Sequence, residues 1–180
     1  MDGTSVIKVG SCVVTFRPVN PGDTEFLFSL YAQTRAEELA PVPWPPQQKE
    51  QFLRQQFSAQ TASYQANYPR AAFWIIIVDG ADAGRLYLHH RKNEIRIMDI
   101  ALLAPFRNRG IGSALLRQVM AEGEKTGRTV TIHVEFFNPA RKLYERLGFH
   151  QVSQTEVYLL LEWRSDRLTT PSLPAPANLK

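Results

Sequence analysis

The sequence predicts an α+β protein built on a mixed sheet. Stretches of apolar alternation, typical of half-buried strands, are interspersed with longer stretches of helical periodicity. Two of the strand-like stretches flank Asp79-Gly80-Ala81-Asp82, a sequence typical of an antiparallel hairpin turn. The predicted order is strand, two helices, three strands, helix, strand, helix and two strands. Because this order lacks the regular strand–helix alternation of a parallel sheet, a mixed α/β fold of the α+β class is favoured.

The composition is that of a globular protein with one domain. The chain has 180 residues, of which 44% are hydrophobic, and ten Phe supply bulk for a core. The single cysteine, Cys12, excludes an internal disulfide and argues against a metal cluster, so we expect no metal. The net charge of +4 is spread along the chain, which argues against nucleic acid as a partner.

Nothing in the sequence indicates a membrane segment. No apolar run reaches the ~20 residues that a membrane span needs. The first ten residues lack the apolar stretch of a signal peptide. We therefore expect a cytoplasmic protein without a membrane partner.

The N-terminal third contains one predicted strand and two predicted helices. They are a strand over 11–19, a helix from 23 or 24 to about 38, and a helix from 47 to about 67. Asp23 or Thr24 is the expected N-cap of the first helix, since short polar side chains accept from free N–H groups there. The prolines between residues 41 and 46 separate the two helices, because proline cannot continue a helix.

The rest of the chain holds the larger part of the predicted sheet. The predicted elements are strands over 71–78, 84–90 and 94–103, a helix over 110–125, a strand over 129–135, a short helix over 139–147, and strands over 149–152 and 156–163. Gly127 and Gly148 are natural stops for the two helices. Residues 164–180 are rich in proline, so we expect an extended, poorly packed tail after a domain over 11–163.

The segment Arg107-Asn108-Arg109-Gly110-Ile111-Gly112-Ser113 joins a predicted strand to a predicted helix. Glycine lets the backbone approach an anion, and the first N–H groups of a helix have no partner within it. A dinucleotide-binding loop would need a third glycine where Leu115 stands, and a phosphate loop of the Walker type would need a lysine after Gly112. The remaining interpretation is a loop that binds a phosphate or pyrophosphate group but belongs to neither of these two loop classes.

A second segment downstream narrows the class of ligand that this loop is expected to bind. Together with this loop, Leu143-Tyr144-Glu145-Arg146-Leu147-Gly148-Phe149 resembles the motifs of the GNAT superfamily of acetyl-CoA-dependent N-acyltransferases. The resemblance covers about Val13 to Trp163 in element order. It implies a mostly antiparallel mixed sheet of about seven strands flanked by four helices. It also implies that the strands 94–103 and 129–135 splay apart and leave a gap for the thioester.

The resemblance implies acetyl-CoA as the acyl donor and a set of residues that bind it. They are Ile100, Ala101, Leu102, Arg107, Asn108, Arg109, Gly110, Ile111, Gly112, Ser113, Asn138, Arg141 and Tyr144. In this scheme backbone N–H groups of the loop hold the pyrophosphate, and the strand ending at Leu102 pairs its backbone with the pantetheine arm. Asn138 stands six positions before Tyr144, where many members have seven, which implies that one of the two is displaced. The alternative is an Asn138 that caps the helix at Pro139, and both roles can hold together.

Two residues are the expected catalytic groups. Tyr144 resembles the family's general acid, since a phenol can protonate a departing thiolate; the alternative is a tyrosine that only fills space. His133 stands where several members have a glutamate base, and an imidazole suits proton removal at neutral pH. The alternatives are a His133–Glu135 pair without a role, Asp99 as the base, or a chain of waters.

The acceptor is expected near the two N-terminal helices. The substrate-binding candidates are Tyr31, Glu37, Glu38, Trp44, Asp99 and Glu135. The carboxylates would attract an ammonium group, and Trp44 would wall the pocket. The alternative is a solvated helix end at Glu37 and Glu38, with Trp44 as a core residue.

The resulting prediction is an N-acetyltransferase that moves an acetyl group from acetyl-CoA to a primary amine by direct attack. The amine is a small molecule or belongs to a peptide. One alternative is a GNAT-like module that binds an acyl-CoA without turnover, and another is an RNA-directed protein, suggested by basic charge alone. Dimers are frequent in the family, so a homodimer is a further expectation of the resemblance.

Overall fold

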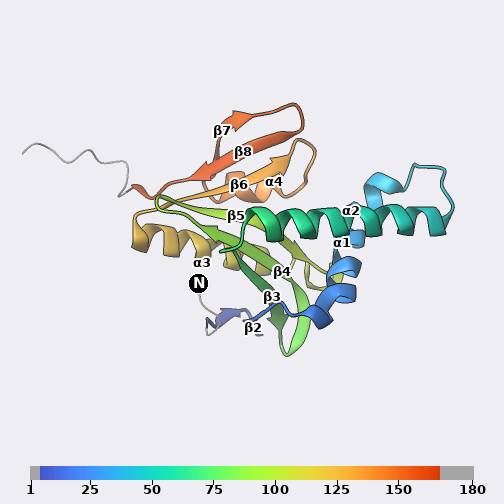
Figure 1. The fold of residues 1–180 in the computed structure, drawn as a ribbon. Helices are drawn as coiled ribbons and strands as arrows, with labels where there is room; N and C mark the ends of the chain where they lie inside the picture. Colours follow the sequence, from blue (N-terminus) through green and yellow to red (C-terminus); the bar gives the residue numbers. More distant parts are fainter. Residues whose placement is uncertain (1–4, 167–180) are drawn as a thin grey trace, which may run out of the picture.

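One eight-stranded sheet runs through the protein, and helices cover both of its faces (Figure 1). The computed structural model describes residues 5–166. The strands are β1 (Ile7–Val9), β2 (Cys12–Pro18), β3 (Ala72–Val78), β4 (Ala81–His90), β5 (Glu94–Leu102), β6 (Thr129–Glu135), β7 (His150–Gln154) and β8 (Tyr158–Trp163). The helices are α1 (Thr24–Leu39), α2 (Pro46–Asn67), α3 (Ile111–Thr126) and α4 (Arg141–Arg146), with short 3₁₀ turns η1 (Pro21–Asp23) and η2 (Ala104–Phe106).

The strand order is β1-β2-β3-β4-β5-β6-β8-β7. Every neighbouring pair is antiparallel except β5 and β6, which are parallel. The predicted α+β class with a mixed, mostly antiparallel sheet is therefore confirmed. The expected seven strands become eight because Ile7–Val9 pairs with β2 around Gly10, whose φ is 57°. A three-residue strand is too short to show any periodicity in the sequence.

The parallel pair β5–β6 separates partway along its length. The two strands are in register only from Glu94 opposite Thr129 to Ile97 opposite Ile132, although both continue further. β5 stays paired with β4 up to Leu102, through a register shift beside Tyr87. The predicted splay between these strands is present. The edge of β5 that would face β6 therefore lacks a strand partner beyond Ile97.

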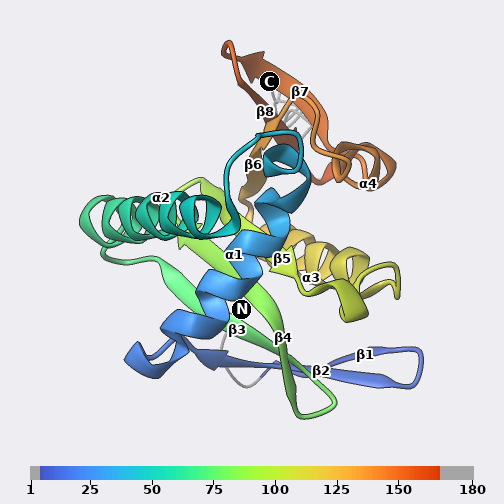
Figure 2. The same ribbon diagram turned by 90° about the vertical axis from the view of Figure 1, so that its right-hand side faces the viewer.

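Helices α1 and α2 lie on one side of the sheet and α3 on the other (Figure 2), and an apolar core lies on each face. Residues of α3 and α4, including Leu115, Leu116 and Tyr144, pack on one face in the larger core. On the other face, Phe28 of α1 and Phe57 of α2 pack edge to face at 5.9 Å. Among the described residues, no helix is both long enough and apolar enough to cross a membrane.

Two local boundaries are corrected by the structure. The hairpin turn is only Asp79-Gly80, because both residues adopt positive φ (51° and 85°) and β4 already begins at Ala81. The short helix begins at Arg141 rather than at residue 139. The predicted tail over 164–180 lies outside the described residues from 167 onward, so it stays a prediction.

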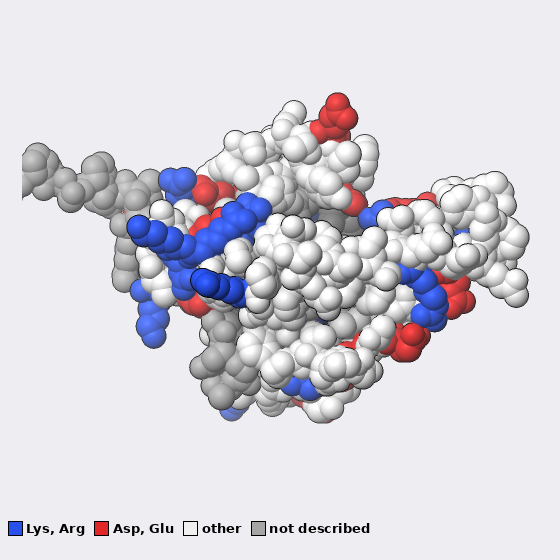
Figure 3. Space-filling view, viewed as in Figure 1, with Lys and Arg blue, Asp and Glu red and all other residues white. Residues whose placement is uncertain are grey.

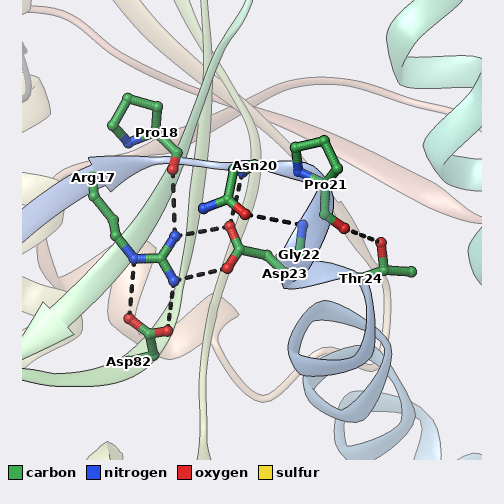
Figure 4. Close-up of polar contacts among 8 residues, drawn as sticks. All are labelled: Arg17, Pro18, Asn20, Pro21, Gly22, Asp23, Thr24 and Asp82. Carbon is green, nitrogen blue, oxygen red and sulfur yellow. Dashed lines mark hydrogen bonds and ion pairs between the residues drawn. The ribbon is translucent and has the colours of Figure 1, made fainter.

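Asp23 stands at the predicted N-cap position of α1, but its carboxylate has another role. Its side chain makes no capping bond to that helix. Both carboxylate oxygens instead accept from Arg17 at 2.8 Å, and one also accepts from the N–H of Asn20 (Figure 4). Arg17 also donates to Asp82, from Nη2 at 2.6 Å and from Nε at 3.3 Å. One guanidinium thus ties β2 to the start of α1 and to the β3–β4 hairpin.

Replacing Arg17 should therefore destabilise the fold. Arg17→Leu leaves the buried carboxylate of Asp23 without its cation, and we expect the free energy of unfolding to fall by about 2 kcal/mol. The Arg17 guanidinium lowers the pKa of Asp23, so its stabilisation is complete above the ordinary carboxyl range and is lost as the pH falls through that lowered value.

Urea unfolding at pH 7 and at decreasing pH measures this effect. Arg54→Leu is the control, because its ion pairs with Glu25 and Glu50 are exposed and should contribute little. Equal losses of unfolding free energy in Arg17→Leu and Arg54→Leu would contradict the role of Arg17. A difference in unfolding free energy between the wild type and Arg17→Leu that persists at pH 2 would contradict it as well.

Candidate functional site

The loop between β5 and α3 has the backbone of an anion cradle. Asn108 and Gly110 adopt positive φ of 59° and 79°, and α3 begins immediately afterwards at Ile111. Within the described part of the chain, the backbone N–H groups from Asn108 to Ser113 donate no hydrogen bond; the first helical bond runs from the N–H of Ala114 to the carbonyl of Gly110. Successive free N–H groups at a helix start attract anions. The residues present therefore fit a phosphate or pyrophosphate.

The arginine side chains of this loop are anchored to the protein. Arg109 donates from Nη2 to the Sγ of buried Cys12 at 2.8 Å, and its guanidinium lies 5.9 Å from the ring centroid of Phe106. Arg107 donates from Nε to the carbonyl of Leu102 at 2.7 Å. In this arrangement the loop presents backbone N–H groups to an anion, and the arginines add positive charge beside them.

The backbone of Ile100, Ala101 and Leu102 borders the gap between β5 and β6. These residues pair with Leu86, Arg85 and Gly84 of β4 on one side. On the other side, the pairing of β5 with β6 ends at Ile97, before these three residues. The carbonyl of Leu102 is already engaged by Arg107, which sequence reasoning did not anticipate.

Tyr144 lies on α4 beside the start of α3. Its side chain is only 4% exposed and packs against Phe149, with ring centroids 5.7 Å apart. A Cβ added to Gly112 would lie 3.7 Å from Leu143, the neighbour of Tyr144, so α4 and the loop are adjacent. Burial raises the pKa of Tyr144, and the negative charge of Asp99 raises it further. The phenol therefore keeps its proton at neutral pH.

Asp99 belongs to a buried pair that the sequence did not reveal. Its Oδ2 accepts from Nη2 of Arg85 at 2.7 Å, and Arg85 is only 3% exposed. The guanidinium also lies 5.4 Å from the ring centroid of Tyr87 and 3.4 Å from Oε1 of Gln60. Burial raises the pKa of Tyr87 to about 12. The available signal was a charged residue within the apolar run of β4.

His133 is exposed on β6, just past the point where β5 and β6 separate. Partial burial lowers the pKa of His133, and the positive charge of Arg96 lowers it further against the opposing effect of Glu94. The imidazole is therefore mostly neutral at pH 7. Glu135 shares this face, as strand alternation predicts, but it does not orient the imidazole because Arg35 of α1 donates to its Oε1 at 3.1 Å.

The predicted acceptor residues fall into two groups. Glu38 and Glu135 come together because Arg35 bridges them, at 2.7 Å and 3.1 Å. Tyr31 is buried against Phe57, with ring centroids 5.8 Å apart, and Trp44 packs on Phe52 at 5.4 Å. Both ring contacts lie within the α1–α2 region, and Tyr31 also belongs to the core between these helices and the sheet. Glu37 is exposed on α1.

The turn before α4 contains the last two predicted ligands. Asn138 accepts at Oδ1 from the N–H of Ala140 at 2.9 Å, so it closes this turn and does not cap α4, whose N-cap is Ala140. Arg141 donates from Nη1 to the carbonyl of Phe136 at 2.8 Å. Both side chains therefore shape the loop that follows β6.

A groove of about 520 Å³ lies away from the loop, where β5, β6 and β8 leave one face uncovered. Its lining pairs Arg96 with Glu94 at 3.1 Å and Arg164 with Glu162 at 2.6 Å. Figure 3 shows basic side chains gathered at one side of the molecule with acidic ones among them. Within residues 5–166, no group of three His, Cys, Asp or Glu side chains is placed to hold a metal ion.

Comparison with known proteins points to one family. Residues 69–151 match the family model described as an acetyltransferase (GNAT) domain. The probable N-acetyltransferase san of Drosophila melanogaster is 30% identical over 92 residues, which are 49% of this chain and 50% of that protein. Human N-acetylaspartate synthetase is 28% identical over 106 residues, 57% of this chain and 35% of that protein. The chain thus spans half or less of the length of these relatives.

Solved structures share the fold. The PaiA N-acetyltransferase of Thermoplasma acidophilum, in complex with coenzyme A, superposes with a TM-score of 0.65 at 16% identity, over 84% of this chain and 99% of that one. Arabidopsis thaliana Naa50, in complex with the bisubstrate analogue CoA-Ac-MVNAL, gives 0.57 at 19% identity, over 84% and 99%. The resemblance that the two sequence motifs predicted is confirmed: residues 69–151 match the model of a GNAT acetyltransferase domain, and the chain shares its fold with solved GNAT acetyltransferases.

Proposed function

We propose that the protein is an N-acetyltransferase that transfers the acetyl group of acetyl-CoA to a primary amine. The loop between β5 and α3 carries this proposal, because its free N–H groups from Asn108 to Ser113 lie beside the end of β5 and beside α4. The GNAT domain match supports it, as do the two relatives named as N-acetyltransferase and N-acetylaspartate synthetase.

Acetyl-CoA would supply an activated acetyl thioester. The N–H groups of Arg109 to Ser113 would bind its pyrophosphate, and the open edge of β5 at Ile100, Ala101 and Leu102 would pair with its arm. Arg107, Asn138 and Arg141 would act at the border of this site by shaping its loops. The complex of the Thermoplasma neighbour with coenzyme A supports a ligand of this class.

Tyr144 is the proposed donor to the departing sulfur. A buried phenol that keeps its proton is a hydrogen-bond donor in a site of low dielectric. Because the pKa of Tyr144 lies above the ordinary phenol value, full proton transfer to a thiolate is uphill. A strong hydrogen bond that stabilises the developing thiolate is therefore its more favourable contribution.

His133 is the proposed base. A neutral imidazole can accept the proton of an acceptor ammonium, and the lowered pKa of His133 keeps it neutral at pH 7. Asp99 is a weaker candidate, since its carboxylate is committed to Arg85. The acceptor amine would then attack the thioester directly.

A cationic acceptor agrees with the charges around Glu135. Glu37, Glu38 and Glu135 are carboxylates in this region, and Arg35 is the cation that bridges two of them. The Arabidopsis neighbour is bound to an analogue that joins CoA to MVNAL, which supports a peptide amine as one acceptor class. A cytoplasmic location and a homodimer stay predictions.

The second candidate is a module that binds acyl-CoA without turnover. It is favoured by the exposure of His133 and by the absence, among the described contacts, of a carboxylate that orients its imidazole. An assay for free thiol with acetyl-CoA and a panel of amines separates the two. Acetyl-CoA binding without thiol release from any amine would favour the module.

The cradle predicts a selective effect of Gly110→Ala. An alanine at φ 79° is strained by about 1 kcal/mol and shifts the N–H groups that follow it. We expect the Kd for CoA to rise about tenfold through weakened N–H contacts to an anion. Gly80→Ala is the matched control, because Gly80 has φ 85° with open space around its Cβ position. Equal CoA affinity in the two variants, measured by calorimetry, would count against the cradle.

The donor role predicts that Tyr144→Phe lowers kcat about 100-fold with little change in the Kd for acetyl-CoA. The ring keeps its contact with Phe149, so the fold should be retained. Tyr158→Phe, an exposed tyrosine on β8, is the control. Steady-state kinetics and calorimetry measure the two quantities. An unchanged kcat in Tyr144→Phe would refute the role.

The base role predicts a pH effect of His133→Gln. In the wild type, kcat/KM should fall as the pH drops through the lowered pKa of His133, because the protonated imidazole cannot accept a proton. His133→Gln should lose this limb and about 100-fold in kcat at pH 7.5. His150→Gln on exposed β7 is the control. Retention of the limb in His133→Gln would assign the base elsewhere.

A further inference from the structure

We propose that Arg35 is a specificity-determining residue that holds the place of the acceptor's ammonium group until an amine displaces it from Glu135. The inference rests on the proposed function, since it concerns the acceptor of that reaction. It adds a residue of α1 that competes with the substrate instead of binding it.

The contacts of Arg35 cross from one side of the site to the other. Its Nη1 donates to Oε1 of Glu135, a residue 100 positions later on β6, at 3.1 Å. Its Nη2 lies 2.7 Å from Oε2 of Glu38, one turn further along α1. Figure 2 shows the C-terminal half of α1 running toward β6. The guanidinium therefore spans the opening between α1 and the strand that carries His133.

The charges favour a cation at this position. Two carboxylates, Glu38 and Glu135, face one guanidinium, so the trio carries a net charge of −1. Arginine stays protonated at any pH of interest, so Arg35 is a permanent cation. An acceptor carboxylate would meet a net negative site, whereas an ammonium would gain from both glutamates.

The bridge is weak enough to be exchanged. The side chains of Arg35 and Glu135 are 36% and 34% exposed, and ion pairs of this exposure contribute little to stability. An incoming ammonium can thus take the place of one guanidinium N–H on Glu135 without a large loss elsewhere. Arg35 keeps Glu38 as a partner after the exchange.

The neighbourhood contains further charged groups that act on the same space. The pKa of Tyr31 on α1 is affected by the charges of four groups, so these groups lie around one region. They are Arg35, Arg85, Glu38 and Glu135. Arg85 is neutralised by Asp99, at 2.7 Å. Arg35 is therefore a partly exposed cation beside Glu135, whereas Arg96, which acts on His133, is paired with Glu94 at 3.1 Å.

The test compares acceptor kinetics in Arg35→Gln, Arg35→Lys and the wild type. The probes are a tetra-alanine amide with a free α-amino group, Nα-acetyl-lysine amide and spermidine. Removing the competing cation should lower the KM for the amine about three- to tenfold, since this is the size of one part-exposed charge contact. The KM for acetyl-CoA should not change, and Arg35→Lys should stay within about twofold of the wild type. Arg54→Gln on α2, whose partners are exposed, is the matched control.

A double variant makes the assignment specific. Glu135→Gln should raise the KM for the amine, and in that background Arg35→Gln should bring no gain, because the contested carboxylate is gone. High salt should narrow the difference between Arg35→Gln and the wild type. Arg35→Met replaces Arg35→Gln if the latter does not fold, which thermal unfolding reports.

The outcomes separate this inference from the proposed function. If an amine is acetylated but its KM is unchanged or raised in Arg35→Gln, Arg35 does not compete and the inference is overturned alone. If no amine in the panel releases thiol from acetyl-CoA with any variant, the proposed function fails. A lower KM that persists in the Glu135→Gln background also overturns the inference, because the gain then has another origin.

Discussion

The separation of β5 from β6 is the constraint around which the rest of the site is arranged. Four residue pairs, from Glu94–Thr129 to Ile97–Ile132, hold the parallel strands together, and beyond them the two backbones diverge. β5 follows β4 instead, through the register shift beside Tyr87. The close approach of Gly84 to the backbone of Ala101 leaves no room for a side chain there. The result is an edge of β5 that has no strand partner beyond Ile97, next to the turn that begins α3.

Tyr144 and His133, the titratable groups of the proposed reaction, are both held in the neutral form by their surroundings. Burial and Asp99 keep Tyr144 protonated, whereas partial burial and Arg96 keep His133 neutral. Arg85 compensates Asp99 inside the sheet, and Arg35 compensates Glu135 at its border. The two neutral groups proposed to act on a thioester and an amine lie on opposite faces of the strand pair, Tyr144 on the side of α4 and His133 on the side of α1.

Much of the fold was accessible from local sequence features. The long helices and most strands were predicted to within a few residues, because their apolar periodicity and their glycine and proline boundaries are local properties. The short strand β1 was missed because three residues carry no period. Asp23 was assigned to a helix cap because its position allowed it, but Arg17, six positions earlier, offered two charge-assisted hydrogen bonds instead.

The sequence by itself determined that a strand passes through a turn with two glycines into a helix, and that a Leu-Tyr motif follows downstream. Such features depend on backbone freedom and periodicity within a few residues. Only the tertiary structure decided which side chains meet: Arg35 with Glu135, Arg85 with Asp99 and Arg109 with Cys12. These partners are 100, 14 and 97 positions apart, so their contact depends on strand register and on how α1 packs across the sheet. A local pattern does not encode that geometry, so the sequence indicated the loop and a list of candidate residues, whereas the fold decided how those candidates are paired.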